Sequence, residues 1–165
     1  MGLLAKMTAL SLTLMCYVGQ VMPANQSQIK VELRLAESDP GKDLIEASVE
    51  KSKEKIHLHK EAIITNEDIA EVRVVRSVGS RRLREDGSLA ETYDIEIDFT
   101  KEGGMRISKI TGENIGKRLA VLFNGKVVMA PTIRGQISDR GVITGNFTKE
   151  EAESIAKGIK GGKMH

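Results

Sequence analysis

The sequence predicts a two-layer α+β fold in which two main helices cover one face of a mostly antiparallel sheet. Apolar and polar residues alternate along several segments of strand length, as is typical of strands with one buried face. Two later segments have apolar residues at helical spacing behind a capping residue. The 165 residues are enough for one domain with a buried core. Many strands with two helices favour a sheet covered on one face.

Strands dominate the first half of the predicted domain. Apolar residues alternate with charged residues from Ile29 to Leu35, and the Asp-Pro-Gly segment at 39–41 ends this strand. Extended stretches are also expected at about 44–49, 56–64 and 72–75, with one capped helical turn at 65–68. The segment from Gly79 to Leu89 is rich in Gly, Arg, Asp and Glu, so we expect a solvated hairpin loop there.

The middle of the chain predicts one strand and one helix. Apolar and acidic residues alternate most regularly from Tyr93 to Phe99, which indicates a strand. Thr100 follows this strand as a helix cap. The apolar residues expected inside the helix are Met105, Ile107 and Ile110. The pair Gly103-Gly104 weakens this helix because glycine has a low helix propensity.

A hairpin follows this helix. Asn-Gly at 124–125 separates two apolar runs, 119–123 and 126–130, and predicts a tight turn because both turn positions need positive φ. Pro131 ends the second run. Short strands are expected near 133–137 and at 142–147.

The last helix has the clearest boundary. Thr148 and the Glu three residues later form a capping box. The residues expected on the buried face of the helix are Ala152, Ile155, Ala156 and Ile159. Glu153 and Lys157 are expected to pair on its exposed side. Because the segments 98–102 and 146–150 both place Phe directly before a capping Thr, we expect two similar strand-to-helix corners on one sheet.

Residues 1–24 have the plan of a secretory signal peptide. A short charged start ends at Lys6, and an apolar run of 12 residues extends from Met7 to Val18. The small residue Ala24 then provides the expected cleavage site. The run is too short to span a bilayer as a stable helix. A buried N-terminal helix is the alternative interpretation. We expect the mature chain to be periplasmic or secreted, with one domain over residues 27–165.

The only cysteine, Cys16, lies inside this leader. A lipoprotein signal would make Cys16 the lipidated residue, but Met15 precedes it where such signals need a small side chain. We therefore expect a cleaved signal peptide and a mature chain without a thiol or a disulfide.

Charge and composition argue against a nucleic-acid-binding protein. The chain has 25 Lys and Arg residues against 23 Asp and Glu residues, a net charge of +2, so a concentrated basic surface is not expected. Aromatic residues make up 3% and Trp is missing, which leaves little on which bases could stack.

The sequence offers no clear catalytic constellation, and no cofactor is expected. The segment 112–118 hints at a phosphate loop, but it is one residue short and has Arg118 where the hydroxyl that binds Mg²⁺ should be. His57 and His59 would lie on the same face of a strand and could share a metal ion, but a metal site needs three or four ligands. A small periplasmic metal-binding protein or enzyme that uses these histidines is an alternative interpretation.

Four segments of the second half carry a resemblance to a known family: 99–104, 111–117, 119–131 and 143–152. Their motifs are Ile-Gly-Lys before an apolar strand, an Asn-Gly-Lys hairpin that ends in Ala-Pro, and Gly-Asn-Phe-Thr-Lys-Glu-Glu-Ala at a helix start. Together they resemble the head subdomain of the first periplasmic domain of SecD, the protein-export accessory subunit, and residues 29–78 resemble it more loosely. The resemblance implies a non-catalytic domain that binds unfolded or translocating polypeptide, or a component of the export machinery or envelope.

The candidate polypeptide-binding residues are Val128, Met129, Pro131 and Ile133. Pro131 is expected to interrupt a strand and free backbone groups, and Met129 offers an adaptable apolar side chain. The alternative is that Met129 belongs to the core and Pro131 only bends the chain. A structural subunit of an envelope complex is a further alternative, because a domain without catalytic residues acts through its surface.

Overall fold

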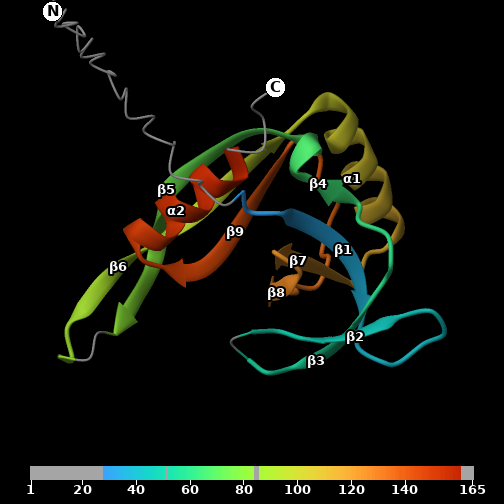
Figure 1. Ribbon diagram of the computed structural model, residues 1–165, viewed down its shortest axis with the longest axis horizontal. Coiled ribbons are helices and arrows are strands. Elements are labelled where there is room, and N and C mark those ends of the chain that lie inside the picture. The colour runs from blue at the N-terminus through green and yellow to red at the C-terminus, as the bar shows by residue number, and fades with distance from the viewer. Residues whose placement is uncertain (1–27, 51, 84–85, 161–165) are drawn as a thin grey trace, which may run out of the picture.

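The computed structural model describes residues 28–50, 52–83 and 86–160, which form two antiparallel sheets and two helices (Figure 1). The first sheet contains β1 (Val31–Glu37), β2 (Ile45–Ser48), β3 (Lys55–Leu58), β4 (Ile64–Thr65), β7 (Arg118–Phe123) and β8 (Lys126–Met129). The second sheet contains β5 (Ile69–Leu83), β6 (Leu89–Phe99) and β9 (Arg140–Phe147). The helices are α1 (Lys101–Glu113) and α2 (Lys149–Lys160), and one 3₁₀ turn, η1, covers Asn66–Asp68. The predicted α+β class is confirmed, while the expected leader at 1–24, with Cys16, lies outside the described residues.

The first sheet curls until its two edge strands meet. Its strand order is β2-β3-β1-β7-β8, with β4 paired to β1. Val49, directly after β2, forms a parallel bridge with Val127 of β8, and the N–H of Glu50 donates to the Val127 carbonyl at 2.8 Å. The small interior of this curled sheet holds a core of its own: Ala36, Val49, Ile56, Leu58, Ala120, Leu122, Val127 and Ala130. Alanines at several of these positions permit the close approach of opposite strands.

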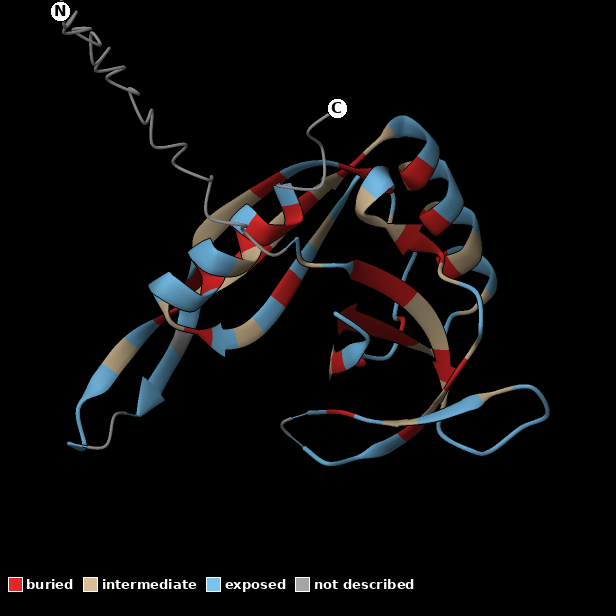
Figure 2. Cartoon of the chain, viewed as in Figure 1, coloured by how far each residue is buried: buried red, intermediate tan, exposed pale blue. Residues whose placement is uncertain are grey.

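The second sheet carries both strand-to-helix corners, as predicted. β6 and β9 are neighbours in it, and each is separated from the helix that follows, α1 or α2, by a single capping residue, Thr100 or Thr148. Because the two strands are antiparallel, the corners lie at opposite ends of the pair. The main core fills the space between the two sheets and the helices, and Figure 2 shows the outer sides of α1 and α2 exposed to solvent.

Close packing explains the glycines at the start of α1. A side chain at Gly103 would place its Cβ 2.8 Å from the Cβ of Asp68, and one at Gly104 would place its Cβ 2.8 Å from the carbonyl oxygen of Ser138. The predicted Thr100 cap is present, since its side chain accepts the Gly103 N–H at 3.1 Å. These glycines weaken the isolated helix, but they allow η1 and the loop that contains Ser138 to pack directly on it.

The apolar residues expected within α1 do not share one buried face. Ile107 is fully buried, but Met105 is 58% exposed. Two residues correspond to about 200° around a helix, so Met105 and Ile107 lie on opposite sides. The buried residues of α1 are instead Gly103, Ile107 and Thr111, at a spacing of four.

The capping box of α2 is confirmed. The N–H of Glu151 donates to Thr148 Oγ1 at 3.2 Å, and the Thr148 N–H donates to the Glu151 carboxylate at 2.8 Å. Ala152, Ala156 and Ile159 are buried, and Ile155 packs at the edge of the same core. Glu153 pairs with Lys149 at 3.9 Å rather than with Lys157, because the residue one turn earlier is equally within reach.

The hairpin loop expected from Gly79 to Leu89 is shorter than predicted. β5 continues to Leu83, and the backbone pairs Arg81 with Glu91 and Leu83 with Leu89. Polar side chains do not prevent this pairing, since both faces of the projecting hairpin lie in solvent (Figures 1 and 2).

The strand expected near 133–137 is not formed. The N–H of Ile133 donates to the Lys117 carbonyl at 2.8 Å, and the Ile137 N–H donates to Thr111 Oγ1 at 2.9 Å. This segment is therefore held by the α1–β7 connection and by a helix side chain instead of by a strand ladder.

Candidate functional site

An apolar hollow of about 90 Å³ lies between the two sheets. Its residues come from both sheets, from α1 and from the segment between β8 and β9: Leu33, Ile97, Phe99, Ile107, Leu119, Val121, Met129, Pro131, Ile137, Gly141, Val142 and Ile143. A space of about 10–15 Å³ is enough for one water molecule, so the hollow has room for several heavy atoms. Its lining is almost wholly apolar, which favours an aliphatic side chain over an ion or a polar ligand.

Two of the four predicted binding residues line this hollow. Met129 and Pro131 contribute to its wall, and Met129 is half-buried. Val128 is the extra residue of an irregularity in the β7–β8 register and also packs against the main core. Ile133 is only 4% exposed, so it supports the site from within the core and is not on its surface.

The backbone around Pro131 is not free, which corrects the expectation from the sequence. The Pro131 carbonyl accepts the Leu119 N–H at 2.9 Å. The Ala130 carbonyl accepts from Arg118 Nε at 2.8 Å. The proline ends β8, but neighbouring donors satisfy the acceptors that the end of the strand would otherwise leave open.

Several lining residues escaped the sequence analysis. Gly141, Val142 and Ile143 belong to β9, and Ile137 belongs to the segment before it. The strand at 142–147 was predictable from its pattern. Its place at the edge of the second sheet, beside the first sheet, depends on long-range pairing that no local pattern encodes.

Three charged side chains on β5, β6 and β9 of the second sheet neutralise one another. Arg140 Nε donates to Asp98 Oδ1 at 2.7 Å, and Arg73 Nη2 lies 2.7 Å from Asp98 Oδ2. The hydrogen bond from Arg140, with that from Arg73, holds the pKa of Asp98 below its ordinary value. Asp98 therefore stays ionised and paired with these two guanidinium groups.

Within the described ranges, His57 and His59 belong to no cluster of three or more potential metal ligands. His59 Nε2 lies 3.1 Å from Glu37 Oε1, and Lys117 Nζ lies 3.0 Å from the same oxygen. His57 is paired across the strands with Glu46. Among the described residues, no group of three or more His, Cys, Asp or Glu side chains could hold a metal ion.

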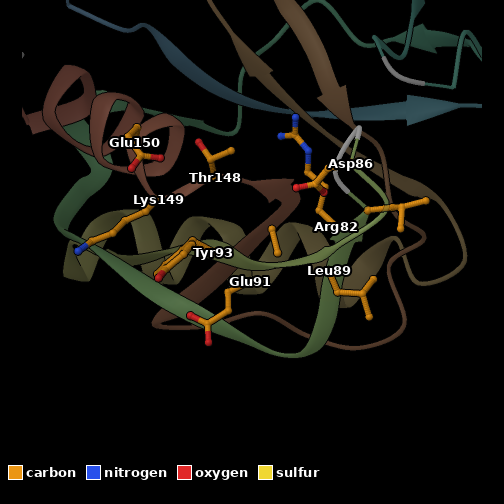
Figure 3. A pocket seen from close by; sticks show the side chains of 10 residues that line it. Arg82, Asp86, Leu89, Glu91, Tyr93, Thr148, Lys149 and Glu150 are labelled. Carbon is orange, nitrogen blue, oxygen red and sulfur yellow. The ribbon is translucent and has the colours of Figure 1, made fainter.

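A second, wider pocket lies between the projecting β5–β6 hairpin and the start of α2 (Figure 3). Leu83 and Leu89 form an exposed apolar pair near the tip of the hairpin, and Arg82 Nη1 lies 3.6 Å from Glu151 Oε2. Side chains of both charges, including Arg82, Glu91 and Lys149, share this open space. It is a solvated concavity of mixed polarity, and nothing in it selects one class of ligand.

Across the described ranges of the chain, no helix is both long and apolar enough to cross a membrane.

Comparison with known proteins identifies the family. The family described as SecDF, P1 head subdomain, matches residues 42–165. The protein translocase subunit SecD of Aquifex aeolicus is 46% identical over 70 residues, which cover 42% of this chain and 14% of that protein. SecDF of Thermus thermophilus is 33% identical over 103 residues, or 62% of this chain and 12% of its own length. The chain thus spans only a small part of these relatives.

Solved structures agree with this assignment. A SecDF structure in the super-membrane-facing form aligns with a TM-score of 0.60 and 26% identity over 81% of this chain and 19% of that one. A second SecDF structure aligns over 82% of this chain and 63% of that one, with a TM-score of 0.57, and its 23% identity supports the fold alone. The recognised motifs, the two-sheet fold and the match to most of the sequence lead to one conclusion: the chain belongs to the SecDF P1 head subdomain family.

Proposed function

We propose that this domain binds unfolded or translocating polypeptide during protein export, outside the cytoplasm. The observation that carries the proposal is the apolar hollow between the two sheets, whose lining includes the half-buried Met129 and the exposed Pro131. The aligned SecDF is described as a membrane component that enhances protein export, and the aligned SecD is a translocase subunit. An unfolded chain exposes apolar side chains that a folded protein buries, so a hollow of this kind favours it over a folded partner.

The proposed role is binding alone. The described residues that line the hollow carry aliphatic, aromatic and thioether side chains, and none of them is titratable. Such a site can hold a segment of polypeptide and release it, which requires no bond to be made or broken. Weak affinity, in the micromolar range or poorer, suits a domain that must release its ligand.

We propose that residues 27–165 form the domain and that residues 1–24 are a signal peptide, which would make the mature chain periplasmic or secreted. The central strand β1 supports the domain boundary, because it begins at Val31, before the family match at residue 42. β1 pairs with β3, β4 and β7, so the first sheet could not form without it.

Binding of a fluorescently labelled secretory polypeptide, kept unfolded by reduction and alkylation, tests the proposed role. Fluorescence anisotropy should show saturable binding to the purified chain. Met129→Asp should weaken binding at least about tenfold, because it brings a charge into an apolar site. Met105→Asp is the matched control, since Met105 is 58% exposed and lies outside the hollow.

Circular dichroism and urea unfolding establish that both variants are folded. If the wild-type chain binds no unfolded polypeptide at any accessible concentration, the proposed function is wrong. If Met129→Asp and Met105→Asp weaken binding equally, the polypeptide binds elsewhere on the domain. The folded form of the same polypeptide should bind more weakly than the unfolded form.

A further inference from the structure

We propose that the polypeptide lies beside the hollow as an extended strand added to the open edge of β9; this inference rests on the proposed function and deepens it. β9 is an edge strand, because the order of the second sheet is β5-β6-β9. Its residues Gly141, Val142 and Ile143 also line the hollow. An unpaired strand edge and an apolar hollow therefore adjoin each other, and an extended peptide could use both.

The register identifies which backbone groups of β9 point away from β6. The Phe99 N–H donates to the Asp139 carbonyl at 2.9 Å, so these two residues form a hydrogen-bonded pair. Hydrogen-bonded and non-hydrogen-bonded pairs alternate along antiparallel strands. Arg140, opposite Asp98, and Val142, opposite Glu96, are thus in non-hydrogen-bonded pairs. Their N–H and C=O groups point toward the open edge.

These outward N–H and C=O groups can form hydrogen bonds with the backbone of an added peptide strand. In the part of the chain that the structure describes, β6 is the only strand paired with β9. Val142, opposite Glu96 on β6, is 49% exposed, so this part of the edge is accessible to solvent. The Arg140 side chain could block an added strand, but its Nε donates a hydrogen bond to Asp98 Oδ1 at 2.7 Å.

The other sheet edges are less suited to this role. The β8 edge of the first sheet is occupied by the bridge between Val127 and Val49 and by the bond from Glu50. β5 forms the opposite edge of the second sheet, and none of its residues lines the hollow. Among the strands that the structure describes, β9 combines an open edge with an apolar space that can accept side chains of an added strand.

This geometry defines the class of polypeptide segment that is bound. In an added strand, alternate side chains face the space between the two sheets, and the others face solvent. The preferred segment therefore has aliphatic residues at alternate positions, and it has no proline at the positions whose N–H groups face β9, where proline could not donate. Backbone hydrogen bonds provide affinity without requiring one particular sequence.

N-methylated peptides test the strand addition. The probe is a short soluble peptide in which valine alternates with serine, made in three forms: unmethylated, N-methylated at its valines, and N-methylated at its serines. In a strand, the residues that face the hollow also share one direction of their N–H groups. The peptide methylated on the N–H groups that face β9 should bind with an affinity about tenfold lower or more. The peptide methylated on the other N–H groups should bind like the unmethylated peptide.

A pair of variants tests the same edge from the protein side. Val142→Pro removes one backbone N–H that points to the open edge, and it breaks no hydrogen bond between β9 and β6. The circular dichroism spectrum should therefore be unchanged, and the affinity for the peptide should fall by about tenfold. Val142→Ala shortens the same side chain but keeps the N–H, so it should weaken peptide binding much less than Val142→Pro does; equal weakening by the two variants would contradict a role for the backbone N–H.

The outcomes separate this inference from the proposed function. Equal binding by both methylated peptides, with the unmethylated peptide bound, would overturn strand addition and leave polypeptide binding intact. No binding of any peptide or of the unfolded polypeptide would overturn both. If Val142→Pro does not fold, the peptide series alone decides.

Discussion

Replacing Gly103 by alanine should destabilise the domain, although alanine is the better helix former. In an open helix position, Gly to Ala stabilises by about 1 kcal/mol. At Gly103 the new Cβ would lie 2.8 Å from the Cβ of Asp68 and 2.9 Å from its carbonyl oxygen. That carbonyl accepts the Thr100 N–H at 2.7 Å, so moving it also strains the start of α1. Forcing extra volume into a packed site costs about 1–3 kcal/mol, which gives a net loss of about 0–2 kcal/mol.

Gly112→Ala, in the same helix, is the matched control. Its Cβ would meet nothing nearer than Gln136 Nε2 at 3.6 Å, an ordinary contact. This variant should gain up to about 1 kcal/mol, so the two variants should differ by about 1–3 kcal/mol in urea unfolding. Equal stability of Gly103→Ala and Gly112→Ala would refute the close packing of α1 on η1.

Three further predictions concern stability. Thr148→Ala should cost about 1 kcal/mol in urea unfolding because it removes half of a capping box, and no loss would mean that the cap is not formed in solution. Ile159→Ala should cost about 2–5 kcal/mol, whereas the exposed-side Lys157→Ala should stay within about 0.5 kcal/mol; equal losses would contradict the orientation of α2. Hydrogen bonds from Lys117 and then His59 hold the pKa of Glu37 below its ordinary value of 4.5. Glu37 thus adds stability above that pH, which is lost as the pH falls through the lower pKa of the folded state. Glu37→Gln should therefore destabilise the chain near pH 7 but not near about pH 2, and an equal effect at both would contradict the ionic role of Glu37.

Local features of the fold were predictable from the sequence because neighbouring residues determine them. The Asn-Gly turn has both residues at positive φ, with Asn124 at 49° and Gly125 at 79°. The two Phe-Thr corners and the capping box of Thr148 depend on segments of about five residues. In each case a backbone conformation or an unpaired donor requires a particular side chain nearby.

Features that depend on distant contacts were not predictable. The buried face of α1 contains Gly103 and Thr111, which an apolar pattern does not recognise. Thr111 is tolerated there because its hydroxyl donates to the Ile107 carbonyl and accepts the Ile137 N–H. The curling of the first sheet likewise requires Val49 and Val127, far apart in sequence, to meet.

The candidate site was predicted in part. Met129 and Pro131 were identified from their residue types beside a strand end, and both line the hollow. The opposite wall, from β6 and β9, could not be inferred, because the division of the strands into two facing sheets is a property of the whole fold. Burial of Ile133 follows from the same division.

A methyl NMR titration tests most directly whether the hollow is the polypeptide site. With ¹³C-methyl methionine, Met129 in the hollow and the exposed Met105 are observed in one spectrum, so Met105 serves as an internal control. Adding the unfolded secretory polypeptide should shift or broaden the Met129 signal in a saturable manner and leave that of Met105 unchanged. An unchanged Met129 signal at saturating polypeptide, or equal changes at both methionines, would contradict the proposed site.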